Sequence, residues 1–270
     1  MASGVVAGVT PTMPHARDVT VEVPPGAGRA RRGAGATVPT MEPPETIRPA
    51  WPRLAAYVGV SALHLVFLAA GPGWAAMATK PLLLPLLFAW FVRATPRGWW
   101  RATIGTGLLL SFFGDVALMG PRDPWFLVGL GAFLVAQVAY AIGFSRDLRR
   151  SVVRRRPLLV LPYLALVVAL VVWLAPDLGD LLVPVAVYAV AIGVMAVLAT
   201  GVSPAVAVGA LLFVASDALL AATSLAGRLV LPMSGLWVMS TYLAGQGLIA
   251  VGVAARARAA TSVAPAEGTV

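Results

Sequence analysis

The stretch LLVPVAVYAVAIGVMAVLA, residues 181–199, decides the fold class, because it runs for nineteen residues without a charged side chain. A helix of about 20 apolar residues, rising ~1.5 Å per residue, crosses the hydrocarbon core of a bilayer. Further apolar stretches of similar length occupy residues 54–70, 74–92, 102–119, 125–144, 158–174, 205–226 and 236–254. The sequence therefore predicts an all-α, polytopic transmembrane helical bundle of about eight spans.

Composition narrows the chemistry. The chain is 59% hydrophobic and 11% charged, whereas a soluble domain has about a quarter of its residues charged. It has no cysteine, which excludes disulfides and thiolate chemistry. Only His64, one of two histidines, lies in an apolar run, so a zinc site built from several membrane histidines is excluded. We predict neither a metal nor a cofactor.

Arginines predict the orientation in the membrane. With the N-terminus inside, seventeen of the twenty basic residues fall on the inner side, and only Lys80, Arg122 and Arg228 fall outside. Such an excess is typical of cytoplasmic loops, so both termini are predicted to be cytoplasmic, in a bacterial-type plasma membrane. Because the arginines lie mostly in loops and tails, nucleic-acid binding is a poor interpretation of the net charge of +9.

Composition also divides the chain. Residues 1–50 are rich in Pro, Gly, Ala and Arg without apolar periodicity, which predicts a disordered cytoplasmic tail. Residues 51–256 form the predicted transmembrane domain, and residues 257–270 a second disordered tail. Translation starting at Met41 would remove most of the first tail.

An internal repeat is suggested by two similar segments. LLLSFFGDVALM at residues 108–119 resembles LLFVASDALLAA at residues 211–222, and the spans that follow carry Gln137 and Gln246 respectively. The order of spans would then give two four-helix halves with the same orientation, a 4+4 parallel repeat.

Three charged side chains lie inside long apolar runs: Asp115, Asp217 and Lys80, the only lysine. A charge in hydrocarbon costs several kcal/mol unless it is paired, neutralised or hydrated. Counted from the outer end of each span, Asp115 lies about 6 Å deep, Lys80 about 9 Å and Asp217 about 14 Å. Other polar side chains at comparable or mid-membrane depth are His64, Gln137, Tyr140, Tyr242 and Gln246. We therefore predict one polar site in the outer half of the membrane.

Each of these residues also has a structural interpretation. Asp115 could reach interfacial water, Asp217 could make a purely structural hydrogen bond, and Lys80 could extend outward along its stem. His64 is more simply a packed core histidine than a catalyst. Gln137, Tyr140, Tyr242 and Gln246 could hydrogen-bond helices together.

At these residues the chain resembles the YhhN family, whose animal members include lysoplasmalogenases. The resemblance rests on Lys80-Pro81 with the following leucines, Gly114-Asp115 after an apolar run, and Ser216-Asp217 within LLFVASDALL. The spacings Phe126…Gly129…Phe133…Tyr140 and Tyr242…Gln246 complete it, and the elements occur in the family's order over residues 57–253. Family members often carry histidine where this chain has Gln137, so a proton-transfer role there is in doubt.

The resemblance implies hydrolysis of the vinyl-ether bond of lysoplasmalogens to a fatty aldehyde and a glycerophospho-base. It implies a lysophospholipid substrate. From depth alone we predict that Asp217, the deeper and more desolvated acid, is the general acid and Asp115 the base or electrostatic stabiliser, although the two roles could be exchanged. Lys80 would bind the phosphate or stabilise the charge of Asp115. The remaining polar residues would orient water or the glycerol hydroxyl and complete the substrate site: Tyr140, Tyr242, Gln246, His64 and Gln137.

Two other functions fit the same residues. Buried charges at the interface of two repeats also occur in proton-coupled small-molecule or lipid transporters, and a lipid-binding protein could hold a headgroup without chemistry. The sequence leaves open the headgroup, which aspartate is the acid, a divalent ion between the two carboxylates, and the oligomeric state.

Overall fold

Apolar runs become helices here because the backbone polar groups of a membrane span must be satisfied within the segment. The computed structural model describes residues 51–262, apart from the side chains of Arg122 and Asp123, and every regular element in this range is helical. The predicted disorder of residues 1–50 and of the last residues of the chain lies outside the described residues. The long helices are α1 (Trp51–Ala70), α2 (Gly73–Ala94), α3 (Trp99–Ala117), α4 (Arg122–Phe144), α6 (Val160–Leu178), α7 (Leu182–Ala199), α8 (Pro204–Leu220) and α9 (Ser234–Ser262).

Short helical segments connect the long ones. A 3-10 helix (η1, Ser145–Arg150), the four-residue α5 (Val152–Arg155) and a second 3-10 turn (η2, Pro157–Leu159) lead from α4 to α6. A third 3-10 turn (η3, Gly179–Leu181) joins α6 to α7. A π-helical turn (η4, Ala221–Leu225) extends α8.

Hydropathy supports an integral membrane protein. Six helical segments within residues 51–262 are long and apolar enough to cross a bilayer, and one of them, Pro157–Ala199, contains both α6 and α7. Helix α3 is not among them, mainly because its charged residues Arg101 and Asp115 lower its mean hydropathy. The count of eight spans and the cytoplasmic position of both ends therefore stay predictions.

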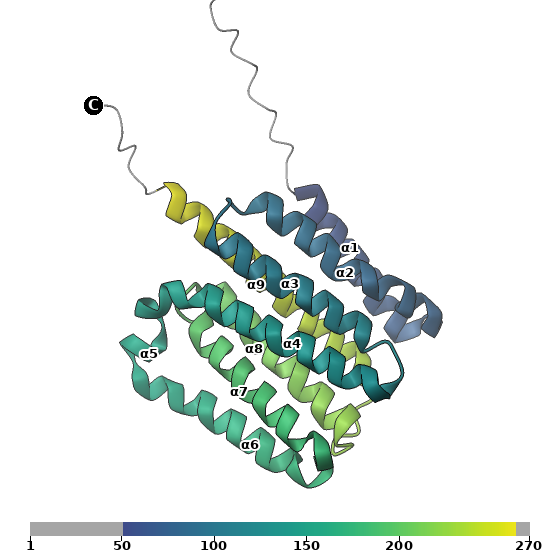
Figure 1. Ribbon diagram of the computed structural model, residues 1–270. Helices are drawn as coiled ribbons and strands as arrows, with labels where there is room; N and C mark the ends of the chain where they lie inside the picture. The colour runs from purple at the N-terminus through teal and green to yellow at the C-terminus, as the bar shows by residue number, and fades with distance from the viewer. Residues whose placement is uncertain (1–50, 263–270) are drawn as a thin grey trace, which may run out of the picture. The chain divides into compact units, whose positions relative to one another are not determined.

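Helices that are neighbours in the chain pack side by side (Figure 1). The closest pairs are α1 with α2, α3 with α4, and α8 with α9, while α4 lies beside α7 and α9 also touches α1, α2 and α3. If α1–α4 are superposed on α6–α9, the contact between α4 and α7 corresponds to the one between α9 and α2, and both exist. These pairings agree with the parallel repeat, which stays a prediction.

Small residues let α8 and α9 approach closely. A Cβ added at Gly209 would lie 2.8 Å from the carbonyl oxygen of Gly245, and one added at Gly245 would lie 2.8 Å from the carbonyl oxygen of Gly209. Any larger side chain at either position would push the helices apart, as at other membrane interfaces built on small residues.

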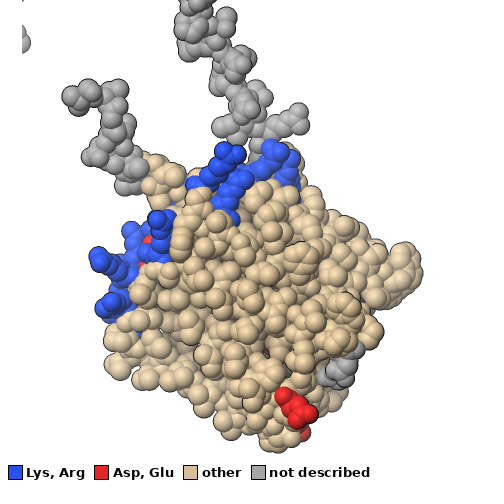
Figure 2. All heavy atoms as spheres, in the orientation of Figure 1, with Lys and Arg blue, Asp and Glu red and all other residues tan. Residues whose placement is uncertain are grey.

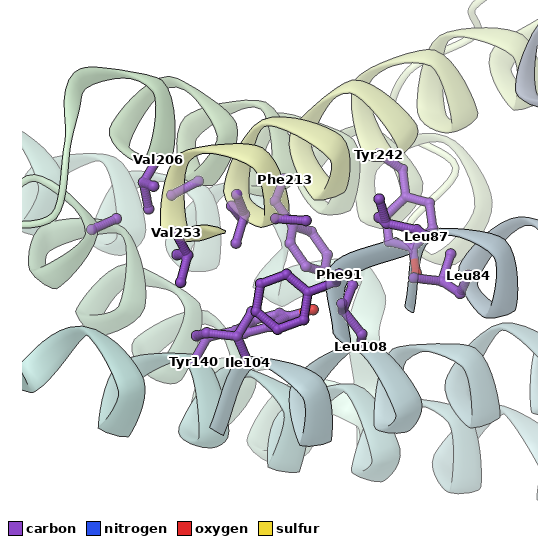
Figure 3. Close-up of a cluster of buried hydrophobic side chains, with 14 of the residues drawn as sticks. Leu84, Leu87, Phe91, Ile104, Leu108, Tyr140, Val206, Phe213, Tyr242 and Val253 are labelled. Atoms are coloured by element: carbon purple, nitrogen blue, oxygen red, sulfur yellow. The ribbon is translucent and has the colours of Figure 1, made fainter. Parts of the chain in front are cut away.

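The core is filled by side chains from α2, α3, α4, α8 and α9 that face one another (Figure 3). Phe91, Ile104, Leu108, Tyr140 and Phe213 have no exposed surface. The aromatic rings meet edge-on, with Phe213 and Tyr242 centroids 5.3 Å apart, which suits their electrostatics.

Basic side chains gather at one end of the bundle (Figure 2), where α2 and α9 end and α5 lies. There the buried Asp147 of η1 accepts a hydrogen bond from Arg256 Nη2 at 2.7 Å, and the Arg256 guanidinium lies 5.3 Å from the Trp100 ring. Arg258 Nη1 donates to the Ala94 carbonyl at 2.7 Å. We refer to this as the arginine-rich end.

The end of α9 differs from the predicted boundary between the transmembrane domain and the C-terminal tail. Residues 257–262 were predicted to belong to a disordered tail, but α9 continues to Ser262. The arginines of its last turns are anchored on Asp147 and Ala94, and the surrounding alanines favour helix, so the helix extends past the apolar stretch.

Candidate functional site

A cavity of about 470 Å³ opens between α2, α3, α4, α7, α8 and α9. It lies away from the arginine-rich end, because Lys80 is in the second turn of α2, whereas Arg93 is in the last turn, and Asp115 is in the last turn of α3. Its apolar wall includes Leu118, Phe126, Leu130, Phe133, Val185, Leu220, Ala221, Leu225, Val238 and Met239. Its polar lining consists of Lys80, Asp115, Tyr188, Ser216, Asp217, Ser224 and Tyr242.

Asp115 is paired from two sides. Its side chain is 7% exposed, the Tyr242 hydroxyl donates to Oδ2 at 2.8 Å, and Lys80 Nζ lies 3.8 Å from Oδ1. A buried carboxylate is costly without such partners. The lysine, 21% exposed, keeps part of its surface toward the cavity. Lys80 and Asp115 therefore form an ion pair whose lysine remains accessible to a ligand.

Asp217 has different surroundings. The Tyr188 hydroxyl donates to Asp217 Oδ2, and Gln137 Nε2 donates to the same hydroxyl at 3.2 Å. No described Lys or Arg side chain lies within ion-pair distance of Asp217. The two acids thus share one cavity, but among the described side chains only Asp115 has a neighbouring cation.

By exposed surface Asp217 is the less buried of the two acids, and its greater desolvation stays a prediction. Asp217 is half-buried and faces the cavity, whereas Asp115 is buried at 5% exposure. Depth along a helix does not fix exposure, because the cavity reaches the deeper residue while Tyr242 and Lys80 cover the shallower one.

Tyr188 is a site residue that the sequence reasoning missed. It is buried, lines the cavity and links Asp217 to Gln137. A signal existed, since it is the only polar side chain in residues 181–199. In isolation it looked like one more bulky residue of an apolar span.

Three predicted substrate-binding residues lie behind the cavity wall. Tyr140 donates to Gln246 Oε1 at 2.8 Å in the core, and Gln137 reaches the cavity only through Tyr188. Gln137, Tyr140 and Gln246 do not line the cavity. The prediction that they touch the substrate or its attacking water is therefore corrected: they support the residues that do line it. Their spacing placed them on inward faces, where they contact other core side chains instead: Tyr140, for example, packs edge-on against Phe213.

His64 is also outside the cavity lining, which corrects its predicted place in the substrate site. Its Nδ1 lies 2.8 Å from Thr79 Oγ1, and its side chain is buried between α1 and α2. The structure favours the packed core histidine over a ligand-binding one.

Comparison with known families identifies the chain. The YhhN family matches residues 75–253, about two thirds of the sequence, including Lys80 and both cavity aspartates. The chain belongs to the YhhN family. No curated protein and no solved structure matches it.

In this YhhN protein an apolar layer separates the cavity from the arginine-rich end. Phe91, Ile104, Phe144, Ile249 and Val253 have no exposed surface, and Phe144 stacks on Tyr140 with centroids 6.3 Å apart. The core between the Tyr140–Gln246 hydrogen bond and the Asp147–Arg256 pair therefore contains a layer of tightly packed apolar side chains.

The cavity of this YhhN protein offers two carboxylates to a ligand or metal ion. Among the side chains that the structure describes, no three His, Cys, Asp or Glu residues come together as a protein metal site usually requires. The chemistry that the lining residues themselves can perform is proton transfer by the acids and anion binding by Lys80.

Proposed function

We propose that this protein is a membrane hydrolase that cleaves the vinyl-ether bond of lysoplasmalogens or a closely related alkenyl lysolipid. The products are a fatty aldehyde and a glycerophospho-base. Support comes from YhhN family membership and from the cavity itself. The cavity combines an extended apolar wall with a few polar groups at one place, which is how sites for amphiphilic ligands are built.

The observation that carries the proposal is the unequal environment of the two aspartates. Lys80, 3.8 Å from Asp115, stabilises a negative charge on that acid, while Asp217 has no neighbouring cation among the described residues. Pairs of carboxyl groups held in different surroundings divide into a proton donor and a charged partner. Asp217 is therefore assigned as general acid and Asp115 as base or electrostatic stabiliser.

The first step is proton transfer to carbon. The carboxylic acid of Asp217 donates its proton to the β-carbon of the vinyl ether, and the π electrons form the new C–H bond. The positive charge is then shared between the α-carbon and the ether oxygen as an oxocarbenium ion. The Asp115 carboxylate, fixed by Tyr242 and Lys80, stabilises this cation electrostatically.

Water completes the reaction. Its oxygen adds to the α-carbon and its proton passes to a carboxylate, which gives a hemiacetal and restores charge balance. The hemiacetal then collapses: its hydroxyl proton is taken up, the carbonyl forms, and the glycerol oxygen leaves with a proton. One water molecule is consumed, and both aspartates return to their starting states.

Substrate orientation follows from the lining. The partly exposed ammonium of Lys80 binds the lipid phosphate, and the single alkenyl tail extends along the apolar wall toward Leu130, Val185 and Leu225. A lipid ether bond lies next to the glycerol, close to the phosphate. The vinyl ether would then sit between the lysine and the two carboxylates.

The packing favours hydrolysis over the main alternative, a proton-coupled transporter. Transport requires a polar path through both leaflets, but the layer of Phe91, Ile104, Phe144, Ile249 and Val253 is closed and apolar. A lipid-binding protein without catalysis would need the lysine but not a second acid that lacks a cationic partner.

The test uses purified full-length protein in detergent with three lysolipids that share one headgroup. They carry an alkenyl, an alkyl or an acyl chain. Aldehyde release from the alkenyl lipid alone, lost in the Asp115→Asn and Asp217→Asn variants, is the expected result. Folded protein that converts none of the three would rule out the hydrolase, and proton-driven flux in liposomes would then support the transporter.

A further inference from the structure

A second hollow lies on the surface of the bundle between α2 and α3, far from the catalytic cavity. Its volume is about 340 Å³. The apolar part of its wall comes from Phe88 and Val92 of α2 and from Leu109 of α3. Arg97, in the α2–α3 connection, and Arg101, in the first turn of α3, line its other end. We call it the α2–α3 groove.

The groove is hollow because α3 presents small residues to it. A Cβ added at Gly105 would lie 3.4 Å from the Phe88 ring, which already packs against the bare backbone. With Thr106 exposed beside it, no large α3 side chain fills the space between Phe88 and Leu109. The space between these residues is therefore open to an apolar chain lying along the groove.

Neither arginine has an acidic partner among the described side chains. The ion pairs found there join Asp115, Asp147 and Asp177 to other basic residues, and neither Arg97 nor Arg101 takes part in any of them. Arg97 is exposed and Arg101 half-buried, so both guanidinium groups are accessible. Two cations at one end of an apolar groove complement a ligand with an anionic head.

The polar and apolar ends of the groove are arranged like the head and chain of a membrane lipid. Its arginines lie at the arginine-rich end, where α2 has ended at Ala94 and α3 begins at Trp99, whose exposed ring is typical of the membrane interface. From Arg101 to Leu109 the helix rises about 12 Å toward the middle of the bundle. A charged head at the surface and a chain running inward would match both ends.

We propose that the α2–α3 groove binds an anionic phospholipid, with its phosphate on Arg97 and Arg101 and one acyl chain along Phe88, Val92 and Leu109. Basic pockets between membrane helices are known to hold anionic lipid headgroups. This lipid is not the substrate, because the catalytic cavity lies toward the other end of α2 and α3. Binding at this site would anchor the arginine-rich end of the protein to a leaflet that contains anionic phospholipids.

Native mass spectrometry of the delipidated full-length protein tests the site. Phosphatidylglycerol and phosphatidylcholine with the same chains are titrated separately, and the dissociation constant of the first bound lipid is measured. At about 1 kcal/mol for each surface arginine, R97Q/R101Q should weaken phosphatidylglycerol binding about 30-fold. The matched control R154Q/R155Q removes two exposed arginines from the same end outside the groove and should change binding less than about 3-fold.

Two further measurements distinguish binding of a lipid in the groove from attraction of an anion by charge alone. Thr106→Trp fills the groove from its exposed side and keeps both arginines, so it should weaken lipid binding about 10-fold, or 1.4 kcal/mol. Glycerol phosphate, which lacks the chains, should fail to displace the lipid. Equal loss in the control pair, equal binding of phosphatidylcholine, unchanged binding in Thr106→Trp, or displacement by glycerol phosphate would each overturn the proposal.

Discussion

Replacing Asp217 by asparagine should remove activity without removing the fold. Asparagine keeps the shape of the side chain, and its carbonyl oxygen can still accept the hydrogen bond from Tyr188. Weakening of this hydrogen bond then costs about 1 kcal/mol, which lowers the thermal midpoint of a chain of this size by about 2 to 4 °C. The amide cannot donate a proton to carbon, however, so kcat should fall about 10²- to 10⁴-fold, the usual contribution of a general acid.

The assay follows aldehyde release and thermal unfolding on the same purified sample. Asp180→Asn is the matched control, because Asp180 is exposed in η3 and lies outside the cavity. It should keep full activity. Asp217→Asn that retains more than about a tenth of wild-type kcat would refute the general-acid assignment, since no such residue contributes so little.

Three further predictions follow from the contacts. Lys80→Met should raise KM more than about tenfold for a phosphate-bearing substrate but not for the matching alkenyl glycerol, because a charged hydrogen bond is worth about 1.5 to 3 kcal/mol; equal effects on both would contradict phosphate binding. Tyr188→Phe should lower kcat about 10- to 100-fold by removing the hydroxyl that positions Asp217, with KM unchanged; steady-state kinetics decides, and a pure KM effect would argue against positioning. Arg256→Gln removes the 2.7 Å partner of the buried Asp147 and leaves it only Arg150, 3.9 Å away. Breaking a buried ion pair costs about 3 to 5 kcal/mol, so the thermal midpoint should fall by at least about 6 °C; a smaller shift would show that Arg150 compensates.

Much of the architecture was predictable because hydropathy acts locally. Eight apolar stretches in the sequence coincide with the eight long helices of residues 51–262, differing mainly at their ends. The convergence of Lys80, Asp115, Asp217 and Tyr242 on one cavity was also predictable, because all four have a similar depth and charged groups in a membrane seek partners.

Pairing between helices was not predictable from one sequence. The depth of a residue in the membrane does not determine which neighbouring helix its side chain faces. The sequence therefore did not reveal that Tyr188 would contact Asp217. Nor did it reveal that Gln137, Tyr140 and Gln246 would lie behind the cavity wall. The end of α9 was missed for a similar reason. Its last turns are fixed by contacts with residues far away in the chain, such as that of Arg258 with the Ala94 carbonyl.

The proposed reaction begins with protonation of carbon followed by attack of water, and isotopes test both steps in one experiment. The purified protein is given an alkenyl lysolipid in D₂ ¹⁸O, and the aldehyde is reduced at once so that its hydrogens cannot exchange. We predict one deuterium on the carbon next to the former carbonyl and no ¹⁸O in the glycerophospho product. An aldehyde without that deuterium, or ¹⁸O on the glycerol oxygen, would contradict the mechanism.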